Sequence, residues 1–332
     1  MRDLTRRSLL IAVAGAAATA ACSASGERPQ APAAGAAPGF PLTVGNTGRT
    51  LTFAAPPARI VSLYPSMTDL LIALGAEGRL VGQAGTGYSA PQPQYKDKAA
   101  AVPVLADTEA TTEALLNARP DLVVSDQEYH FDGKRLPRRD DLAGRGIQVY
   151  INRALHEPTK VTSTVPDSFA DVLDLGRILG TTHLAEPLTA GLRQQLSDVE
   201  ARLAGVTPVG AVLLTSYDSA LYAHAGGLYG DVLTRAGARN LTEQAEIPAG
   251  EYYGQLSPEV IARKNPEVIV YVYRTEDNRV SSEQEMRRLF AATAAGRSGR
   301  FVPIEEASFG GALRSAPAVA SLARALHPQA FR

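Results

Sequence analysis

The sequence predicts an α/β fold of two lobes, each with a parallel-type sheet, joined by a single long α-helix with a ligand cleft between the lobes. Three observations carry this prediction. Short apolar runs alternate with amphipathic helical segments through most of the chain. The segment TTEALLNARPDLVV at 111–124 is echoed by SPEVIARKNPEVIV at 257–270, with a Glu seven residues before a Pro in both. A long helical segment at 183–205 separates the two echoes.

Length and composition point to a soluble globular protein. The chain has 332 residues and 45% hydrophobic content, enough to bury a large core and more in keeping with two domains than one. Its 33 basic and 34 acidic side chains are balanced and form no basic stripe. Nucleic-acid binding, which needs such a stripe, is therefore not expected.

Residues 1–21 read as a signal peptide for export. A basic start precedes the stretch LLIAVAGAAATAA, which is too short and too rich in Ala to span a bilayer comfortably. Arg6 and Arg7, adjacent in TRRSLL, are typical of twin-arginine signals, and an ordinary basic leader is the alternative.

Cys22, the only cysteine, directly follows this apolar stretch. A single Cys in an exported chain cannot form an internal disulfide. The stretch TAAC resembles a bacterial lipobox, with Thr19 where Leu is usual. We expect lipidation at Cys22, the alternative being an incidental Cys near an ordinary cleavage site. Residues 22–40, rich in Ala, Pro, Gly and Ser, predict a disordered tether, so that the body lies outside the cytoplasm, lipid-anchored to the cell membrane.

The N-terminal lobe is assigned to 41–182. It opens with an apolar run, a helix and a second apolar run within 59–83, a βαβ unit. Ser66 followed by Asp69 predicts a capping-box start for this helix, and Gly75 predicts its end. Further apolar runs at DLVVS and IQVYI, with a helix around RRDDLAGRG between them, complete an α/β pattern.

The segment 183–205 predicts the interlobe helix. Its apolar residues recur every three or four positions and form one stripe: Leu188, Leu192, Leu196, Val199 and Leu203. A helix of this length spans about 30 Å. The C-terminal lobe, 206–332, again alternates, with predicted strands GAVLLTSY, EVIVYVY and RFVPIE and helices at GDVLTRAGARN, EQEMRRLFAATAAG and APAVASLARALHP.

Ligands of such sheets bind beyond the carboxyl ends of the strands. The residues at these strand ends and in the neighbouring loops are rich in Tyr and Arg. The ligand-binding residues that we predict are Tyr88, Tyr129, Arg153, Tyr217, Tyr253 and Arg314. Further strand-end or loop positions are Tyr64, Pro65, His130, Tyr222, Tyr252 and Arg274.

Several segments together resemble the periplasmic binding proteins of the iron-siderophore, haem and vitamin B12 type. They are ARIVSLYPSMTDLLIALGAEGRLVG, EALLNARPDLVVS, DLGRILG, LTRAGARN and LSPEVIARKNPEVIV. Such proteins are extracytoplasmic receptors of ABC importers, with two Rossmann-like lobes joined by one long helix. The resemblance implies binding groups at the loops of Tyr88, Tyr253 and Arg314. It also implies, as partner, an ABC permease dimer with its ATPase.

The resemblance gives a role to the two repeated acids. Glu113 and Glu259 match family positions at which a Glu on each lobe docks against arginines of the permease. The alternative is that each merely favours a helix N-terminus, an effect worth about 0.3 to 1 kcal/mol. That alternative explains either Glu but not the duplication.

The predicted ligand is a ferric siderophore. Tyr faces pack on a bulky organic chelate, and Arg donors meet hydroxamate or catecholate oxygens. We expect no other cofactor, no metal site built by the protein, and a monomer. Haem is the nearest alternative, because Tyr with or without His130, His156 or His224 can ligate its iron. Cobalamin is the other alternative, although the chain has no Trp to offer an indole platform.

An enzyme is the hypothesis from another class, and the motifs argue against it. AGGLYGD is not a GxGxxG that follows a strand, and neither GxSxG nor a P-loop occurs. A signalling receptor that shares the fold without transport is a third possibility. The genes beside this one would separate it from an importer, which needs a permease and an ATPase.

Overall fold

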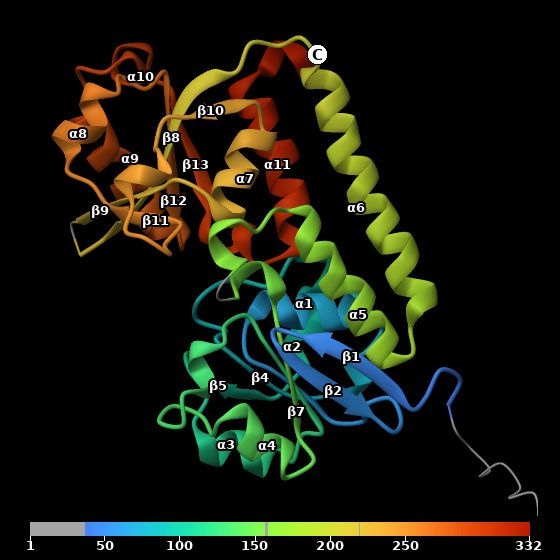
Figure 1. The fold of residues 1–332 in the computed structure, drawn as a ribbon. Helices are drawn as coiled ribbons and strands as arrows, with labels where there is room; N and C mark the ends of the chain where they lie inside the picture. The colour runs from blue at the N-terminus through green and yellow to red at the C-terminus, as the bar shows by residue number, and fades with distance from the viewer. Residues whose placement is uncertain (1–36, 157–158, 219) are drawn as a thin grey trace, which may run out of the picture. The chain divides into compact units, whose positions relative to one another are not determined.

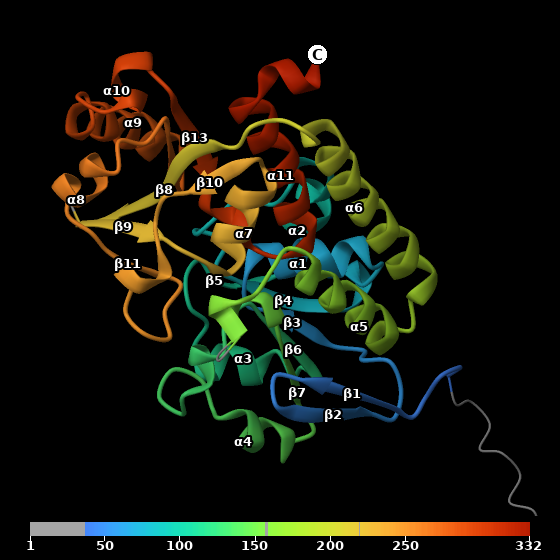
Figure 2. The same ribbon diagram turned by 45° about the horizontal axis from the view of Figure 1, so that its top comes forward.

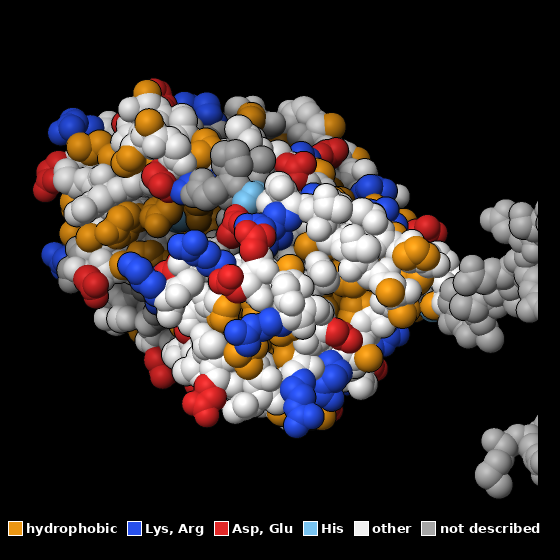
Figure 3. Space-filling view, turned by 60° about the horizontal axis from the view of Figure 1, so that its bottom comes forward, with side chains coloured by type: hydrophobic (Ala, Val, Ile, Leu, Met, Phe, Trp, Pro, Cys, Tyr) orange, Lys and Arg blue, Asp and Glu red, His pale blue; other side chains and the backbone are white. Residues whose placement is uncertain are grey.

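The computed structural model describes residues 37–156, 159–218 and 220–332, and Figure 1 shows their arrangement. The signal peptide, Cys22 and most of the tether lie outside the described residues and stay predictions. Among the described helices, none is both long and apolar enough to cross a membrane. On the face in Figure 3, Lys and Arg side chains are interspersed with Asp and Glu rather than gathered into a patch of one sign.

The N-terminal lobe contains a five-stranded sheet that is parallel throughout, as predicted. Its spatial order puts the third strand at one edge and the first strand in the centre, which is the Rossmann order 3-2-1-4-5. The strands are, in that order, β5 (Val104–Ala106), β4 (Leu80–Ala84), β3 (Ile60–Ser62), β6 (Leu122–Ser125) and β7 (Gln148–Ile151). The helices are α1 (Pro65–Ala73), α2 (Lys96–Ala100), α3 (Thr112–Asn117), α4 (Arg139–Ala143) and α5 (Phe169–Leu179). The strand order reverses at β3, so a crevice opens between its carboxyl end and those of its neighbours.

An antiparallel hairpin that the sequence pattern did not predict, β1 (Leu42–Asn46) and β2 (Arg49–Phe53), lies beside β7 (Figure 2). Asn46 attaches it to that strand. Its side-chain amide donates to the carbonyl of Ile151 at 2.8 Å and its side-chain oxygen accepts from the Ile151 N–H at 2.8 Å. The hairpin thereby covers an edge that would otherwise expose unpaired backbone groups.

Helix α1 does not begin as predicted. Tyr64 is its N-cap, without a side-chain hydrogen bond, and Pro65 occupies the first helical position. Proline suits that position because its missing N–H would have no partner there. Asp69, expected to close a capping box on Ser66, instead forms an ion pair with Arg314. The predicted end of the helix is confirmed, because Gly75 adopts φ 75°, a left-handed conformation that favours glycine.

The long helix predicted between the lobes is α6 (Thr182–Leu203). Leu192, Leu196 and Val199 of the predicted stripe are buried. The helix packs against α5 of the N-terminal lobe and against α11 of the C-terminal lobe, and runs along one side of both (Figure 1).

The C-terminal lobe has a mixed sheet, with parallel pairs as predicted and two antiparallel strands that the sequence pattern did not predict. Its order is β11 (Tyr253–Gln255), β9 (Ala220–His224), β8 (Val209–Tyr217), β12 (Val268–Tyr273) and β13 (Phe301–Glu305), with β10 (Ala238–Asn240) also paired to β8. Strands β9 and β11 are antiparallel to their neighbours. The connection between β8 and β9 is too short for a parallel crossover. The helices are α7 (Gly227–Arg235), α8 (Pro258–Arg263), α9 (Glu276–Leu289), α10 (Ala294–Ser298) and α11 (Ala312–Leu326).

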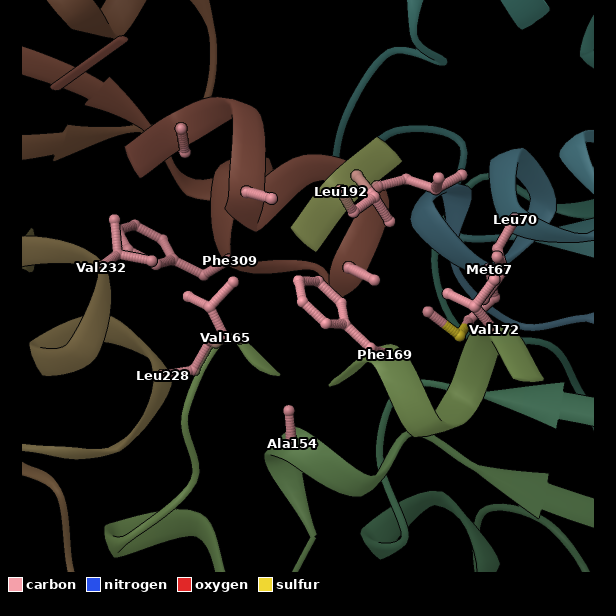
Figure 4. Packing of buried hydrophobic residues seen from close by; sticks show 14 of the residues in the cluster. Met67, Leu70, Ala154, Val165, Phe169, Val172, Leu192, Leu228, Val232 and Phe309 are labelled. Carbon is pink, nitrogen blue, oxygen red and sulfur yellow. The ribbon is translucent and has the colours of Figure 1, made fainter. Parts of the chain in front are cut away.

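One hydrophobic core runs through both lobes. In Figure 4, Val165 from the segment before α5 and Phe169 at the start of α5 lie with Leu228 and Val232 of α7 and with Phe309 of the C-terminal lobe. Each lobe also has a separate cluster of its own between its sheet and its outer helices. The lobes are therefore joined by continuous packing as well as by α6.

A buried ion pair crosses the same interface. Arg314 of α11 donates to Asp69 of α1 at 2.5 Å and to the carbonyl of Ala90 at 2.8 Å. The Asp69 carboxylate also accepts from the Gln92 N–H at 3.1 Å, and the Gln92 side chain donates to the Leu313 carbonyl at 3.1 Å. Burial raises the pKa of Asp69, and the Arg314 charge opposes that shift only in part. Among the described residues, the cation paired with this carboxylate is Arg314, which comes from the other lobe.

We predict that Arg314→Met destabilises the protein by about 3 to 5 kcal/mol, because it leaves the Asp69 carboxylate buried without a cation. The double variant Asp69→Leu/Arg314→Met should recover most of that loss, since two apolar side chains need no partner. Urea unfolding followed by circular dichroism measures both. Arg324→Met, an exposed position on the same helix, is the matched control. Equal unfolding free energies for Arg314→Met and Arg324→Met would contradict the role of the pair.

Candidate functional site

A cleft of about 290 Å³ lies between the lobes where strand ends of both sheets meet. From the N-terminal lobe, Tyr64 follows β3 and Asp126 follows β6. From the C-terminal lobe, Arg274 follows β12 and Glu306 follows β13. The remaining lining residues are Tyr88, Gln127, Tyr129, Leu155, Tyr229, Phe309 and Gly310. A cleft thus lies at the carboxyl ends of strands from both lobes, where the rule places ligand sites in such sheets.

A glycine turn positions Tyr88 in the cleft. Gly85 has φ 78°, and its carbonyl accepts from the Tyr88 N–H at 2.9 Å. A Cβ at this position would lie 3.1 Å from the Tyr88 ring, so a larger residue would push the ring away. The ring stacks on that of Tyr64 with centroids 6.0 Å apart. Burial, reinforced by nearby carboxylates that include Asp126, raises the pKa of both tyrosines, so both present neutral hydroxyls.

Tyr129 forms the exposed rim of the N-terminal wall. Its side chain is 52% exposed, and the Arg135 guanidinium lies 5.3 Å from its ring centroid. The His130 ring lies 4.3 Å away on the same short turn. Burial of the hydroxyl, with the charges of Asp126 and Glu109, raises the pKa of Tyr129 to about 12. This rim can therefore pack on a ligand through an aromatic face while its hydroxyl remains a donor.

Arg274 and Glu306 form the charged part of the opposite, C-terminal wall, and Tyr217 contacts them from outside the lining. Arg274 donates to Glu306 at 2.5 Å, and the Tyr217 hydroxyl donates to the other oxygen of that carboxylate at 2.5 Å. The Arg274 guanidinium also lies 4.8 Å from the Tyr217 ring centroid. Burial alone would lower the pKa of Arg274, but its hydrogen bond and ion pair with Glu306 outweigh burial and raise it. The wall therefore carries a fixed cation whose charge Glu306 already balances.

An aromatic column supports the cleft from behind. The Tyr229 ring lies between Phe309, 3.7 Å away, and His224, 4.3 Å away. The Tyr253 ring contacts the far side of His224 at 5.5 Å. The Nε2 atom of His224 is hydrogen-bonded to the Thr215 hydroxyl at 2.8 Å. Burial lowers the pKa of the His224 ring to about 3, so the ring stays neutral. The column fixes the position of Tyr229 by ring packing.

The structure brings together two of the six residues predicted to bind ligand. Tyr88 and Tyr129 line the cleft, and Tyr217 contacts its wall through Glu306. Tyr253 lies in the column behind. The two arginines lie elsewhere because carboxylates of their own hold them. Arg153 is paired with Asp174 and donates to the Gly45 carbonyl at 2.6 Å, and Arg314 is paired with Asp69.

Arg153 borders a larger cavity of about 690 Å³ between the β1–β2 turn, residues 153–156 and 162–173, and α6. No strand end of the C-terminal sheet is among the described residues that line that cavity. We therefore take the smaller cleft between the lobes as the candidate site.

The sequence reasoning missed several residues of the cleft. Asp126, Gln127 and Glu306 follow predicted strands directly, and the same carboxyl-end rule selects them. The sequence analysis selected mainly Tyr and Arg as ligand-binding residues, and so it did not include these two acids and Gln127. Tyr229 and Phe309 come from helical segments, for which no strand-end signal exists. Tyr64 and Arg274, named as strand-end positions but not among the six, do line the cleft.

The repeated Glu residues have the same backbone setting in both lobes. Glu113 and Glu259 are exposed, in the first turns of α3 and α8. Thr111 and Ser257 cap these helices by accepting from backbone N–H groups at 3.2 and 3.4 Å.

Each of the two helices also ends in the same way. Arg119 and Asn265 have positive φ values of 46° and 47°, and each precedes the buried Pro that leads into a central strand. Neither Glu lines the cleft. The sequence echo therefore reflects one structural unit used twice.

Comparison with known proteins places this geometry in a family. A sequence model described as periplasmic binding protein matches residues 60–307. A cobalamin-binding protein of Halobacterium salinarum is 27% identical over 243 residues, which cover 70% of this chain and 58% of the relative. The chain thus spans less than two thirds of that relative's length. A vitamin B12-binding protein of Photorhabdus laumondii is 25% identical over 217 residues, which cover 65% of this chain and 71% of the relative.

Solved structures share the fold at lower identity. A periplasmic binding protein from Veillonella parvula has a TM-score of 0.76 and 19% identity, covering 86% of this chain and 97% of its own. A structure titled ABC-type Fe³⁺-hydroxamate transport system, from Saccharomonospora viridis, has a TM-score of 0.69 and 23% identity, with coverages of 88% and 99%. A periplasmic heme binding protein from Pseudomonas aeruginosa has a TM-score of 0.64 and 24% identity, with coverages of 82% and 94%. Because the family model spans most of the chain, this protein belongs to the periplasmic binding protein family.

Proposed function

We propose that this protein is an extracytoplasmic solute-binding lipoprotein that captures a ferric siderophore between its lobes and delivers it to an ABC permease. The observation that carries the proposal is the cleft itself. Strand ends of two sheets meet there around neutral tyrosine hydroxyls and one fixed arginine. Family membership supports a role in binding and transport rather than catalysis.

The chemistry of the cleft suits an iron chelate. Tyr64 and Tyr88 offer a stacked aromatic surface for an organic ligand, and their hydroxyls can donate to hydroxamate oxygens. The volume of about 290 Å³ is near the lower limit of small-molecule sites, roughly 300 to 1,000 Å³. A chelate of ordinary size would therefore rest in the cleft with part of its surface in solvent.

A haem- or cobalamin-binding protein of the same importer type is the second candidate. The two relatives that bind cobalamin or vitamin B12 and the haem-binding structure favour it. The cleft offers haem iron a less suitable environment. A tyrosine ligates iron as the phenolate, whereas burial and acidic neighbours raise the pKa of Tyr64, Tyr88 and Tyr129. His224 lies behind Tyr229, outside the lining.

We predict that a ferric trihydroxamate quenches tyrosine emission saturably, and that haemin and cyanocobalamin bind more weakly. Tyr88→Phe removes one neutral hydrogen bond, worth about 0.5 to 1.5 kcal/mol, so affinity should fall roughly 2- to 12-fold. Tyr95→Phe, at a position outside the cleft lining, is the control and should bind as the wild type does. Tighter binding of haemin or cyanocobalamin, with a distinct absorption spectrum, would transfer the proposal to that ligand.

Attachment to the membrane is part of the proposal and rests on the position of Cys22 after the predicted signal. We predict that Cys22→Ala moves the protein from the membrane fraction to the soluble or secreted fraction, because the lipid has no other acceptor thiol. The melting temperature should not change, since Cys22 precedes the folded body. Ser23→Ala, the neighbouring position, is the control. A Cys22→Ala protein that still sediments with membranes would rule out lipidation as the anchor.

Docking on the permease is assigned to Glu113 and Glu259, one on each lobe, each facing arginines of one permease subunit. Both side chains are exposed in the first turn of a capped helix. An exposed carboxylate contributes within about 1 kcal/mol to its own domain. Close charge pairs across an interface couple by about 1.5 to 7 kcal/mol. Replacing these two acids should therefore affect docking on the permease much more than the stability of the protein.

We predict that Glu113→Lys/Glu259→Lys binds ligand and melts as the wild type does, while uptake of the ferric chelate by cells is lost. The reversal adds repulsion to the lost attraction. Glu186→Lys/Asp198→Lys, two exposed acids on α6, makes the same change in net charge and should import normally. Wild-type growth of the first variant on the chelate as sole iron source would show that these two acids do not dock the permease.

A further inference from the structure

The charges around the cleft are unequally balanced. Arg274 of the cleft lining is paired with Glu306, and Arg135, whose guanidinium lies beside the Tyr129 ring, is paired with Asp132 at 2.8 Å. Among the lining residues themselves, one arginine faces two acids, Asp126 and Glu306. The lining thus carries one uncompensated negative charge, and Asp126 is its source.

Asp126 is buried, with a residue exposure of 7%, and it lines the cleft directly after β6. Within the described residues its Oδ1 atom has no hydrogen-bond partner. The Nε2 atom of His130 is 3.6 Å from it, beyond hydrogen-bond reach. A buried carboxylate oxygen without a donor is costly, so a donor supplied by a bound ligand would be strongly favoured here.

The Asp126 charge is felt across the N-terminal wall. Burial is the largest cause that raises the pKa of Tyr64, Tyr129 and Tyr88, and the Asp126 charge acts in the same direction on all three. These hydroxyls therefore stay protonated and can donate to the oxygens of a chelate. An anionic ligand would meet the same field as repulsion.

We propose that the cleft selects a cationic ferric hydroxamate, whose ammonium group donates a hydrogen bond to Asp126 while its neutral iron-chelate core packs on the tyrosines. The inference rests on the proposed function and names the ligand class of the same site. Ferric tris-catecholates, which carry several negative charges, are excluded by the same electrostatics. Arg274 does not reverse this preference, because Glu306 holds it in an ion pair.

Three probes that share one iron-chelate core test the charge preference. Ferrioxamine B carries a free ammonium on a neutral ferric trihydroxamate, its N-acetyl derivative is neutral, and its N-succinyl derivative carries a carboxylate. Titrations at pH 8, where an ordinary imidazole is neutral, follow tyrosine quenching. We expect ferrioxamine B to bind about tenfold or more tighter than the N-acetyl form, the effect of one charge-assisted hydrogen bond, and the N-succinyl form to bind weakest.

The variant Asp126→Asn assigns the preference to this residue, because it removes the charge and keeps the shape. Its affinities for the ammonium and N-acetyl probes should come within about threefold of each other, well short of the tenfold expected from a charge-assisted bond. Asp141→Asn, an exposed acid on α4, makes the same change in net charge and should keep the wild-type preference. An Asp126→Asn protein that keeps the full preference would overturn the assignment.

Failure of the inference is distinct from failure of the proposed function. If the wild-type protein binds the three probes equally, or the N-succinyl probe most tightly, the charge selection is wrong and siderophore binding stands. If none of the three probes binds, the siderophore proposal itself fails and the inference fails with it. The wild-type comparison needs no variant, so a poorly folded Asp126→Asn protein would not remove the test.

Discussion

The contact between the two lobes is the constraint on which the rest of the structure depends. A single hydrophobic core passes from α1 and α5 into α7 and α11, and the Asp69–Arg314 pair is buried within that interface. A buried ion pair adds little net stability, but it fixes which surfaces can meet, because any other register leaves a charge unpaired. Gly310 shows how closely they meet, since a Cβ there would lie 2.7 Å from Ser66. The width of the cleft is therefore a property of the interface, already present before a ligand binds.

A cleft of fixed width makes its electrostatics specific. Tyr64 and Tyr88 cannot rotate away from each other without leaving their stack, and Arg274 cannot leave Glu306 without breaking their ion pair. The neutral hydroxyls, the balanced arginine and Asp126, whose Oδ1 atom has no hydrogen-bond partner among the described residues, thus hold their positions relative to one another. Such preorganisation lowers the entropy lost on binding. The affinity then depends strongly on the charge that the ligand carries next to Asp126.

The sequence predicts what local patterns encode and misses what depends on distant partners. Hydrophobic periodicity was sufficient to predict the parallel N-terminal sheet, and it predicted α6 to within about two residues at each end. Both elements bury apolar side chains at regular positions along the chain. The strand-end rule located the cleft. The roles of Arg153 and Arg314 could not be read in this way, because a guanidinium looks the same whether it meets a ligand or a carboxylate 245 residues away. Tyr229 was missed for a related reason, since its position depends on stacking against Phe309 from another element.

The internal echo relates the outer and inner surfaces of the two lobes. At the outer end of each unit, the capped helices α3 and α8 expose a Glu in the same backbone setting. At the inner end, the strands β6 and β12 that follow these helices lead to opposite charges, Asp126 and Arg274. The two lobes are alike at their outer surfaces, where Glu113 and Glu259 would meet two similar permease subunits. They differ at the cleft, where a single asymmetric ligand would bind. Glu306 neutralises Arg274 on the β12 side of the cleft, whereas the Asp126 charge on the β6 side is left unbalanced. The cleft is therefore more acidic toward β6. A ligand with one cationic end has one preferred orientation in it, with that end toward β6.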